Sequence, residues 1–594
     1  MQNNTIRLRS CPKHYTYDQD KACTPVQTVE RFHERLQAVK LDILKEVRRI
    51  DTGRLDIPVF FSVCGRDAAR IIGTKKQMGK GSTPEQSRAS ACMELAERFS
   101  FFSFLKNPDN FLVGDYAAMQ AAGHPVLPLT ELLRSVHDEI RSPELLERLL
   151  AGLPLRWTWA RNLSRDEDVL VPFSWFYAIN EFNGPCAGNT IEEAMLQGIS
   201  EIVERHVCAV IAREQRPVPA IDLSTVTDPV ARELIEKFER NGIRLRCNDF
   251  SLDTGIPTVG ALAWDPATFP DKSELVYTAG TTPGPDKALI RALTEVAQLA
   301  GDFESGSNYV ASGLPKPLSL AEVDYVINPG QTVPLSALPD LSTDDMLDEL
   351  RGCLAALRQR GMEVFAVNTM HPQLQIPTAY TIIPGAHFRE RAASGDAALF
   401  AAKLAAELLD PAALEGKLAA MSKELPQAYY LEFYRGRNLY ERGMAEAALP
   451  CFAKALRLDP QDEDKPYLHS YYGACLRDLG RFEEAVPVLE QGLACDEERP
   501  DLHNMLGVCH YKASRFQQAV HHFQRAVQLN PVSAIDYANL ALNLQRLGRK
   551  DEAIRNYQTA LSQDMDIAFA VENLALLMAE AEGGTTDNGW VGGG

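Results

Sequence analysis

The chain has 594 residues, which is enough for roughly two to four domains of about 100 to 200 residues each. Hydrophobic residues make up 45% of the sequence and charged residues 24%, a composition that supports large cores and excludes wholesale disorder. Lysine and arginine number 61 against 80 aspartate and glutamate residues, and the resulting net charge of −19 disfavours nucleic acid and anionic membrane surfaces as general partners.

The sequence also restricts the compartment. No stretch reaches the roughly 18 apolar residues of a membrane-spanning helix, and the N-terminal segment lacks the apolar region of a signal peptide. The twelve cysteines form no Cys-x-x-Cys pair, so neither a zinc site nor a disulfide framework is supported. We therefore expect a cytoplasmic protein that spans no membrane.

The first part of the chain alternates apolar runs, rich in β-branched and aromatic residues, with helical stretches. This alternation predicts an α+β or α/β domain over residues 1–394. The predicted strands are 57–63, 171–178, 258–264, 275–278, 363–367 and 378–383. An alanine-rich helix is predicted for 396–409, within a helical linker that we place at 395–426.

One helical pattern occurs twice in this domain, at an offset of 107 residues. It reads Ser90-x-x-x-Glu94-x-x-Glu97-Arg98 in the first copy and Gln197-x-x-x-Glu201-x-x-Glu204-Arg205 in the second. Both copies follow a glycine, a short polar residue and a threonine, at 81–83 and 188–190. Residues three and four apart share a helix face, so each copy predicts an acidic stripe with one guanidinium. A duplicated half-domain explains the constant offset.

A third variant, Arg291-x-x-x-Glu295-x-x-Gln298, follows a glycine-rich turn at 280–284. Glycine-rich turns expose backbone N–H groups at positive helix ends, where phosphate binds. Carboxylates facing the same phosphates require hard cations between them, and Mg²⁺ accepts both kinds of oxygen. A single copy of such a pattern is usually a solvated face with i,i+4 ion pairs, but the repetition favours a functional site.

Three stretches together resemble the YcaO family over about residues 1–394: Gly79-Lys80-Gly81-Ser82-Thr83 with the first copy, 187–205 with the second, and Arg291-Ala292-Leu293-Thr294-Glu295. The resemblance implies an α+β ATP-binding domain with duplicated α/β halves and no Walker loop. It also implies ATP and Mg²⁺ as cofactors and O-phosphorylation of a backbone amide in a peptide or protein. The nucleophile is left open: a Cys, Ser or Thr side chain gives an azoline, and a sulfide equivalent gives a thioamide.

The resemblance also assigns roles to individual residues. The implied magnesium ligands are Glu94, Glu97, Glu201 and Glu204. The implied catalytic contacts to the phosphates are Arg205, Arg291 and Glu295. The implied nucleotide-binding residues are Lys21, Thr28, Lys80, Ser90, Arg98, Asn189, Glu193, Gln197 and Gln298.

Several residues keep a second interpretation. Lys21 and Thr28 resemble a Lys/Ser pair that touches ATP in the family, but they also fit a solvated lysine and a helix-start threonine. Lys80 could meet a phosphate or the peptide carbonyl, or face water from its turn. His206 and the cysteines at 92, 186 and 208 are interpreted as packed residues, and His387 as a candidate for a peptide groove.

The C-terminal third contains a repeat. Gly436, Gly473, Gly507 and Ala541 are each followed after twelve residues by an alanine and after sixteen by Phe452, Leu489, Phe523 or Tyr557. This spacing predicts paired helices in close contact and resembles the tetratricopeptide repeat over about 427–563. We expect an all-α solenoid at 427–582 with a capping helix over 567–579, and a disordered tail at 583–594.

The solenoid stands where azoline-forming relatives carry a proline-rich C-terminus, which favours thioamide formation or a related sulfur insertion. We expect protein docking on the repeats, with a sulfur-delivery or TfuA-like partner. Azoline formation is the first alternative, and a scaffold or accessory role in ribosomal-protein methylthiolation is the second. Homodimerisation stays open.

Overall fold

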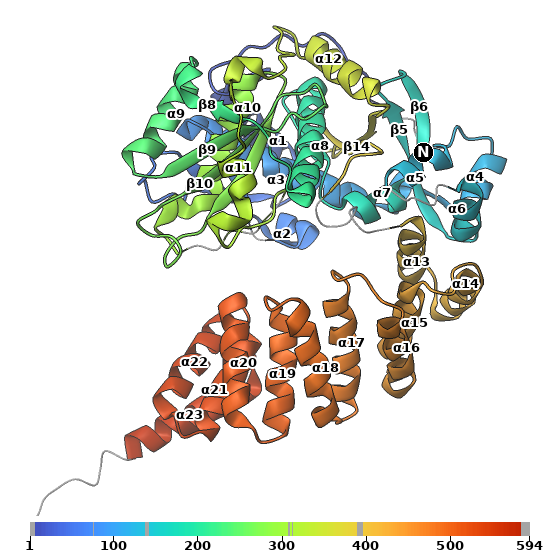
Figure 1. Cartoon of the computed structure of the whole chain (residues 1–594), viewed down its shortest axis with the longest axis vertical. Helices are drawn as coiled ribbons and strands as arrows, with labels where there is room; N and C mark the ends of the chain where they lie inside the picture. Colours follow the sequence, from blue (N-terminus) through green and yellow to red (C-terminus); the bar gives the residue numbers. More distant parts are fainter. Residues whose placement is uncertain are drawn as a thin grey trace, which may run out of the picture. The chain divides into compact units, whose positions relative to one another are not determined.

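The computed structural model describes residues 6–74, 76–136, 142–306, 309, 311, 313–388 and 396–583. The chain divides into two compact units, Met1–Leu404 and Ala405–Gly594 (Figure 1). The finer division at 394 and 426 stays a prediction. The predicted tail at 583–594 lies, apart from Gly583, outside the described residues.

The first unit contains three β-sheets. The first has the order β1 (Leu44–Arg49), β2 (Val59–Cys64), β3 (Lys76–Lys80). The second has the order β11 (Val276–Thr281), β10 (Thr258–Trp264), β9 (Arg244–Asp249), β8 (Ala220–Asp222), β12 (Thr332–Pro334). The third has the order β4 (Leu112–Gly114), β5 (Leu155–Asn162), β13 (Phe365–Asn368), β14 (Thr378–Ile382), β7 (Pro185–Ala187), with β6 (Glu167–Pro172) also paired to β5.

Neighbouring strands run antiparallel, except that β12 pairs with β8 in parallel. The helices of this unit are α1 (Pro25–Ala38), α2 (Arg66–Ile72), α3 (Pro84–Lys106), α4 (Tyr116–Ala121), α5 (Leu129–Arg134), α6 (Pro143–Leu150), α7 (Phe173–Asn180), α8 (Ile191–Glu214), α9 (Pro229–Arg240), α10 (Pro285–Ala300), α11 (Asp324–Ile327) and α12 (Met346–Gln359). This mixture of antiparallel sheets and packed helices confirms the predicted α+β class.

Three strand–helix units, β3–α3, β7–α8 and β11–α10, carry the three copies of the acidic motif. Thr83 caps α3 by accepting a hydrogen bond of 3.2 Å from the Gln86 backbone N–H, and Thr190 caps α8 in the same way from Glu193. These equivalent caps agree with the predicted duplication. The third helix, α10, begins after Gly284 without a side-chain cap.

A glycine in each of these units touches the backbone of the helix that follows. A Cβ atom on Gly188 would lie 2.4 Å from the Ala194 backbone nitrogen, and one on Gly280 would lie 2.4 Å from that of Ala292. A Cβ atom on Gly81 would lie 2.7 Å from the Ser87 backbone nitrogen. The glycines are therefore required by close packing of each strand against its own helix.

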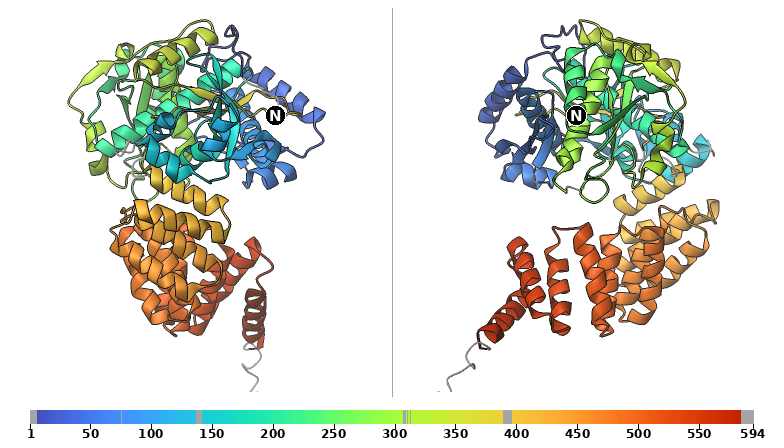
Figure 2. Two further views of the ribbon diagram at one scale, coloured as in Figure 1. Left: turned by 90° about the vertical axis from the view of Figure 1, so that its right-hand side faces the viewer. Right: turned by 60° about the vertical axis from the view of Figure 1, so that its left-hand side comes forward.

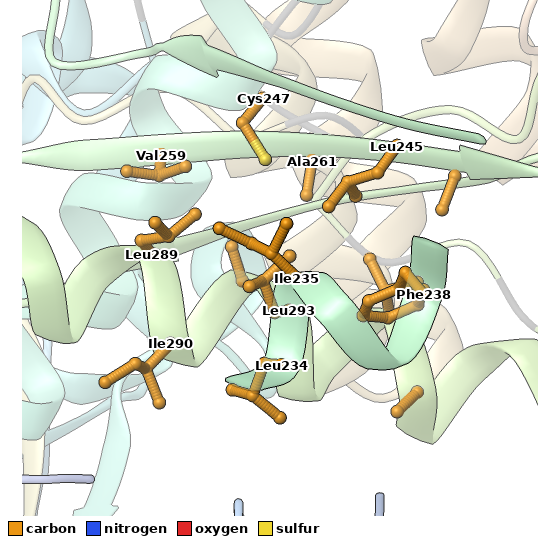
Figure 3. Packing of buried hydrophobic residues seen from close by; sticks show 14 of the residues in the cluster. Leu234, Ile235, Phe238, Leu245, Cys247, Val259, Ala261, Leu289, Ile290 and Leu293 are labelled. Atoms are coloured by element: carbon orange, nitrogen blue, oxygen red, sulfur yellow. The ribbon is translucent and has the colours of Figure 1, made fainter. Parts of the chain in front are cut away.

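A hydrophobic cluster fixes the face of α10 that points away from its motif (Figure 3). Leu289, Ile290 and Leu293 are fully buried in this cluster. Their neighbours come from α9, which includes Phe238, from β9, and from β10, which includes Val259. Burial of such a side chain stabilises the fold by about 1.5–3 kcal/mol. This packing leaves Arg291, Glu295 and Gln298 on the opposite side of the helix.

One predicted strand is wrong in its second half. The sequence 171–178 was expected to be extended, but β6 ends at Pro172 and the helix α7 spans Phe173–Asn180. Proline has no N–H for a further strand hydrogen bond, and the aromatic residues after it are buried around most of a short helix rather than on alternate sides. The other predicted strands are observed within a few residues of their expected bounds.

The second unit is helical. Helix α13 (Ala397–Leu408) crosses the division between the units and confirms the predicted alanine-rich helix. The helices that follow are α14 (Pro411–Glu424), α15 (Tyr429–Glu441), α16 (Ala445–Arg457), α17 (Lys465–Asp478), α18 (Phe482–Cys495), α19 (Pro500–Lys512), α20 (Phe516–Leu529), α21 (Ala534–Arg546), α22 (Lys550–Gln563) and α23 (Ala568–Gly583). Figure 2 shows α15 to α22 stacked as successive antiparallel pairs, with α23 at the end.

Each repeat depends on a contact between a small and a bulky residue. A Cβ on Gly436 would lie 2.8 Å from the Phe452 ring, and one on Gly507 would lie 2.7 Å from the Phe523 ring. Gly473 faces Leu489 in the same way, at 2.2 Å. Residues sixteen apart in the sequence therefore lie in contact between the two helices of each pair, as the tetratricopeptide pattern predicts.

No helix in the described part of the chain is both long enough and apolar enough to cross a membrane.

Candidate functional site

A cavity of about 440 Å³ in the first unit is formed by β3, α3, α8 and α10 together with the N-terminal segment. All sixteen site residues predicted from the sequence line it. They are Lys21, Thr28, Lys80, Ser90, Glu94, Glu97, Arg98, Asn189, Glu193, Gln197, Glu201, Glu204, Arg205, Arg291, Glu295 and Gln298. The three copies of the motif, which are far apart in the sequence, thus contribute to a single site.

Helix α3 contributes the first acidic group. Arg98 donates from Nε to Oε1 of Glu94 at 2.9 Å, and the same nitrogen lies 3.6 Å from Oε1 of Glu97. Burial, followed by the negative charge of Glu94, raises the pKa of Glu97 well above its usual range. One guanidinium therefore does not fully compensate two neighbouring carboxylates.

Helix α8 contributes the second acidic group. Glu201 lies 3.7 Å from Nη2 of Arg205, and Oε2 of Glu204 accepts a hydrogen bond of 3.1 Å from the Thr281 backbone N–H. Burial raises the pKa of Glu201, although the positive charges of Arg205 and Arg98 oppose this shift. The second copy repeats the pattern of the first, with buried carboxylates that favour a further cation nearby.

Helix α10 links these groups. Arg291 donates from Nη1 to Oε1 of Gln197 at 2.6 Å, and its Nε lies 3.5 Å from Oε2 of Glu204. Glu295 pairs with Lys80, which projects from β3. Burial and the positive charge of Arg291 lower the pKa of Lys80 to about 7. The lysine therefore binds and releases a proton near neutral pH.

Two guanidinium donors in the cavity form no hydrogen bond within the described part of the chain, although one of them, Nε of Arg291, lies 3.5 Å from Oε2 of Glu204. Nε of Arg205 and Nε of Arg291 are buried and have no hydrogen-bond partner among the described residues. Buried donors without partners are costly, and an anion with several oxygens would satisfy them. The donor chemistry of the cavity fits phosphate groups.

The N-terminal segment completes the site through a chain of polar contacts. Lys21 pairs with Glu193 at 3.5 Å, Asn189 donates to Glu193 at 3.2 Å, and Thr28 donates to Oδ1 of Asn189 at 3.1 Å. Thr24 caps helix α1, and Thr28 lies in the first turn of that helix, so the alternative interpretation of Thr28 as a helix-start residue stays open. Lys21 and Thr28 therefore contact the second motif, and their implied contact with ATP stays a prediction.

The acidic residues suit Mg²⁺ by donor type. No group of three or more His, Cys, Asp or Glu side chains in the described ranges converges as a preformed metal site. Arginines pair with several of the carboxylates. Mg²⁺ is usually bound through one or two carboxylates plus substrate phosphates and water, so a preformed protein cage is not required. Carboxylate pairs on α3 and α8 meet that requirement when a polyphosphate supplies the other oxygens.

Other lining residues were not predicted. Gln19, Lys76, Gln77, Met78 and Gln86 also line the cavity, and three of them lie on β3 directly before Lys80. The only available signal was their position beside the Gly79-Lys80-Gly81 turn, since Lys-Gln-Met is not a typical strand sequence.

The remaining candidates lie elsewhere. The rings of His206 and His387 stack at 5.2 Å, and the His387 backbone N–H donates to Nδ1 of His206. Neither residue lines the cavity. Cys92, Cys186 and Cys208 are fully buried, and burial raises the pKa of each thiol, which agrees with their interpretation as packed residues.

The fold and the cavity define an α+β nucleotide-site protein followed by a helical repeat. Residues 78–387 match the family described as YcaO cyclodehydratase, ATP- and Mg²⁺-binding, and the chain belongs to this family. ATP and Mg²⁺ are the cofactors of the YcaO family. Residues 500–531 and 537–564 match the tetratricopeptide repeat.

Two relatives extend over most of the first unit. An uncharacterized protein of Methanothermobacter thermautotrophicus is 28% identical over 391 residues, which are 61% of this chain and 94% of the relative. An uncharacterized protein in the tfuA 3′ region of Rhizobium leguminosarum bv. trifolii is 25% identical over 62% of this chain and 88% of the relative. Both alignments leave more than a third of this chain unmatched.

Among solved structures, a heterocyclase in complex with substrate and cofactor superposes with a TM-score of 0.54 at 22% identity. The superposition covers 66% of this chain and 56% of the heterocyclase, so this chain matches little more than half of that enzyme. The similarity supports the YcaO fold of the first unit.

Proposed function

We propose that this protein uses ATP and Mg²⁺ to activate a backbone amide of a peptide or protein by O-phosphorylation, for thioamidation or a related sulfur insertion. The observation that carries the proposal is the single cavity lined by all three copies of the acidic motif. An acidic site with unused guanidinium donors suits a phosphate chain accompanied by hard cations.

The carboxylates of α3 and α8 are the proposed magnesium ligands: Glu94, Glu97, Glu201 and Glu204. When bound there, Mg²⁺ would neutralise phosphate oxygens that these carboxylates would otherwise repel. Arg98 orients the first pair through its contacts with both carboxylates. Gln197 orients Arg291, which in turn contacts Glu204.

The polar chain at the N-terminal side is proposed to bind the nucleotide. Lys21 and Thr28 contact Glu193 and Asn189 directly, and all four residues line the cavity, which supports a shared role in binding. Ser90 and Gln298 line the same cavity from α3 and α10. These two side chains would supply further hydrogen bonds to the ligand.

Arg205, Arg291 and Lys80 would supply positive charge near the phosphate group that is transferred. Glu295 would position Lys80 through their ion pair. The Nε atoms of the two arginines, which form no hydrogen bond among the described residues, would donate to phosphate oxygens. In the proposed reaction a phosphoryl group would pass from ATP to the amide oxygen with release of ADP, a nucleophile would add to the amide carbon and lose its proton, and phosphate would then leave with the former amide oxygen. A sulfide equivalent as nucleophile yields a thioamide.

The helical repeats support an external partner. Solenoids of this kind present extended surfaces that bind other proteins, and a sulfur-delivery protein or the protein substrate would dock there. The relative whose name places it in the tfuA 3′ region supports a TfuA-like protein as that partner. We propose a cytoplasmic location, and homodimerisation remains an open alternative.

Mass spectrometry of the substrate tests the product. Exchange of the amide oxygen for sulfur adds about 16 Da, whereas azoline formation removes water and lowers the mass by about 18 Da, because the departing oxygen is replaced by an external or an internal nucleophile. We expect the gain, dependent on ATP, Mg²⁺ and a sulfur donor. A loss that disappears when a Cys, Ser or Thr of the substrate is replaced would establish cyclodehydration instead.

Azoline formation is the second candidate because the matching family is described as a cyclodehydratase. A third outcome would contradict both reactions. If the substrate mass stays unchanged with every nucleophile while ATP still binds, the chain acts as a scaffold or accessory protein.

A further inference from the structure

Helix α3 borders a second cavity, separate from the one described above. This cavity of about 440 Å³ is lined by the C-terminal half of α3, by β5 and by the loop between β13 and β14. Its residues are Ser100, Ser103, Phe104, Asn107, Asp109, Asn110, Thr158, Trp159, Asn368, Thr369, Met370, His371 and Pro372. Ser100 follows Glu97 by about one helical turn, so the two cavities share the helix but no lining residue.

Two serine hydroxyls in this cavity have unused hydrogen-bonding capacity. Ser100 is fully buried, and its Oγ has no hydrogen-bond partner among the described residues. The same holds for Oγ of Ser103. A serine in a helix commonly bonds back to the carbonyl one turn earlier, and neither serine does so here. A ligand in the cavity would remove the cost of these unpaired groups.

The charge of the lining favours a cation. Asp109 is the acidic side chain among the described residues that line the cavity, and no lysine or arginine is present there. His371 is the one base, and burial lowers its pKa, so it is uncharged at neutral pH. Backbone N–H groups of Gln373 and Leu374 donate to its Nδ1, so the neutral ring carries its proton on Nε2.

The aromatic residues narrow the ligand class. Trp159 and Phe104 line the cavity, and a planar guanidinium can stack on an aromatic ring while its five N–H groups bond to several oxygens. Asp109 can receive two parallel N–H bonds from a guanidinium, which an ammonium cannot donate in the same geometry. The volume lies within the usual range of ligand pockets.

We infer that the second cavity is a binding site for a guanidinium group, such as an arginine side chain of a peptide. Asp109 supplies the charge, Trp159 the stacking surface, and Ser100 a buried hydrogen-bond partner. The inference does not depend on the proposed amide activation, because no residue of the ATP cavity takes part.

Calorimetric titration of the full chain, without ATP or Mg²⁺, tests the site with two probes. Nα-acetyl-arginine amide carries the guanidinium, and Nα-acetyl-citrulline amide has nearly the same shape without the charge. We expect the arginine probe to bind at least about tenfold more tightly, since only its guanidinium forms a charge-assisted pair. Equal affinity, or no binding of the arginine probe, would overturn the inference.

Variants locate the binding. Asp109→Asn should weaken the arginine probe about tenfold and leave the citrulline probe unchanged, while Ser100→Ala should weaken both about fivefold through the loss of one neutral hydrogen bond. Asp271→Asn, a change at an exposed position outside both cavities, is the matched control. If Asp109→Asn keeps its circular dichroism spectrum and its affinity for the arginine probe, the guanidinium does not bind at this cavity.

Discussion

Nη1 of Arg291 donates a hydrogen bond of 2.6 Å to Oε1 of Gln197, and this bond joins the second and third copies of the motif. The same guanidinium lies 3.5 Å from Glu204 through its Nε. Arg291 therefore contacts two residues of α8, seven positions apart, at once. Its planar fork is required for this double contact.

Replacement of Arg291 by lysine tests the contact. The ammonium keeps the charge but cannot reach Gln197 and Glu204 in the same geometry, so we expect the affinity for a non-hydrolysable ATP analogue with Mg²⁺ to fall about tenfold. Calorimetry measures the affinity. Arg351→Lys, at an exposed position of α12, is the matched control and should bind normally. Equal affinity in both variants would show that positive charge alone suffices at Arg291.

Glu201→Gln tests the magnesium assignment. The amide keeps the shape of the carboxylate but loses its charge, so the Mg²⁺ concentration needed for half-maximal binding of the analogue should rise about tenfold. Glu233→Gln on the surface of α9 is the control. A lower Mg²⁺ requirement in Glu201→Gln would mean that Glu201 mainly repels the phosphates, and the assignment would fail.

The lowered pKa of Lys80 predicts that the protein takes up a proton when the nucleotide binds. Its pKa of about 7 lies below the usual value of 10.5, so at pH 8 most folded chains hold it uncharged. A phosphate chain nearby favours the charged form and raises this pKa, so binding at pH 8 should take up close to one proton, and less at pH 6, where the lysine is already charged. Calorimetry in buffers of different ionisation enthalpy measures the uptake. Lys80→Met should abolish the uptake, and an unchanged value would assign the proton to another group.

The solenoid should fold without the first unit. Each repeat buries its apolar face on its neighbours, as the clusters between α19 and α23 illustrate, so residues 427–582 should give a helical circular dichroism spectrum and a cooperative thermal transition. A fragment starting at 405, which adds α14, is the comparison. A disordered spectrum from 427–582 with a folded longer fragment would move the boundary towards residue 405.

Two glycine substitutions in the 405–583 fragment should change the free energy of unfolding in opposite directions. Gly416→Ala, inside α14 with no neighbouring atom within 4 Å of the new methyl group, should raise the free energy of unfolding by about 0.5–1 kcal/mol, because alanine favours the helix. Gly507→Ala would place its methyl group against the buried Phe523 ring and should lower that free energy by about 1–3 kcal/mol. Urea unfolding measures both. A stabilised Gly507→Ala would show that the ring can move aside.

The sequence predicted the candidate site better than the sheets around it. Glu94, Glu201 and Arg291 could be identified because helical spacing and a repeated offset determine which residues share a face, and both are visible in the sequence. The strand β3 could not be identified from the sequence, because Lys76–Lys80 is polar and pairs with β2 through backbone hydrogen bonds. Strand pairing of this kind depends on distant partners rather than on local composition.

The structure of α7 and the second cavity also depend on contacts between distant segments, so neither could be predicted from local sequence. Phe173–Asn180 has the composition of a strand but is helical and buried on most sides, after Pro172 ends the strand. Ser100, Asp109 and Trp159 share no spacing in the sequence, and only the fold brings them together. A cavity lined by three separate segments leaves no periodic signal.

The glycine contacts with α3, α8 and α10 also restrict motion. At Gly81, Gly188 and Gly280 the helix backbone lies so close that an added Cβ atom would collide with it, and this close packing opposes sliding of each helix along its axis. The motif carboxylates lie about one to three turns beyond these contacts, so the contacts limit axial displacement of the carboxylates. The acidic groups are thus held at constant spacing, and a ligand needs to reorient only side chains.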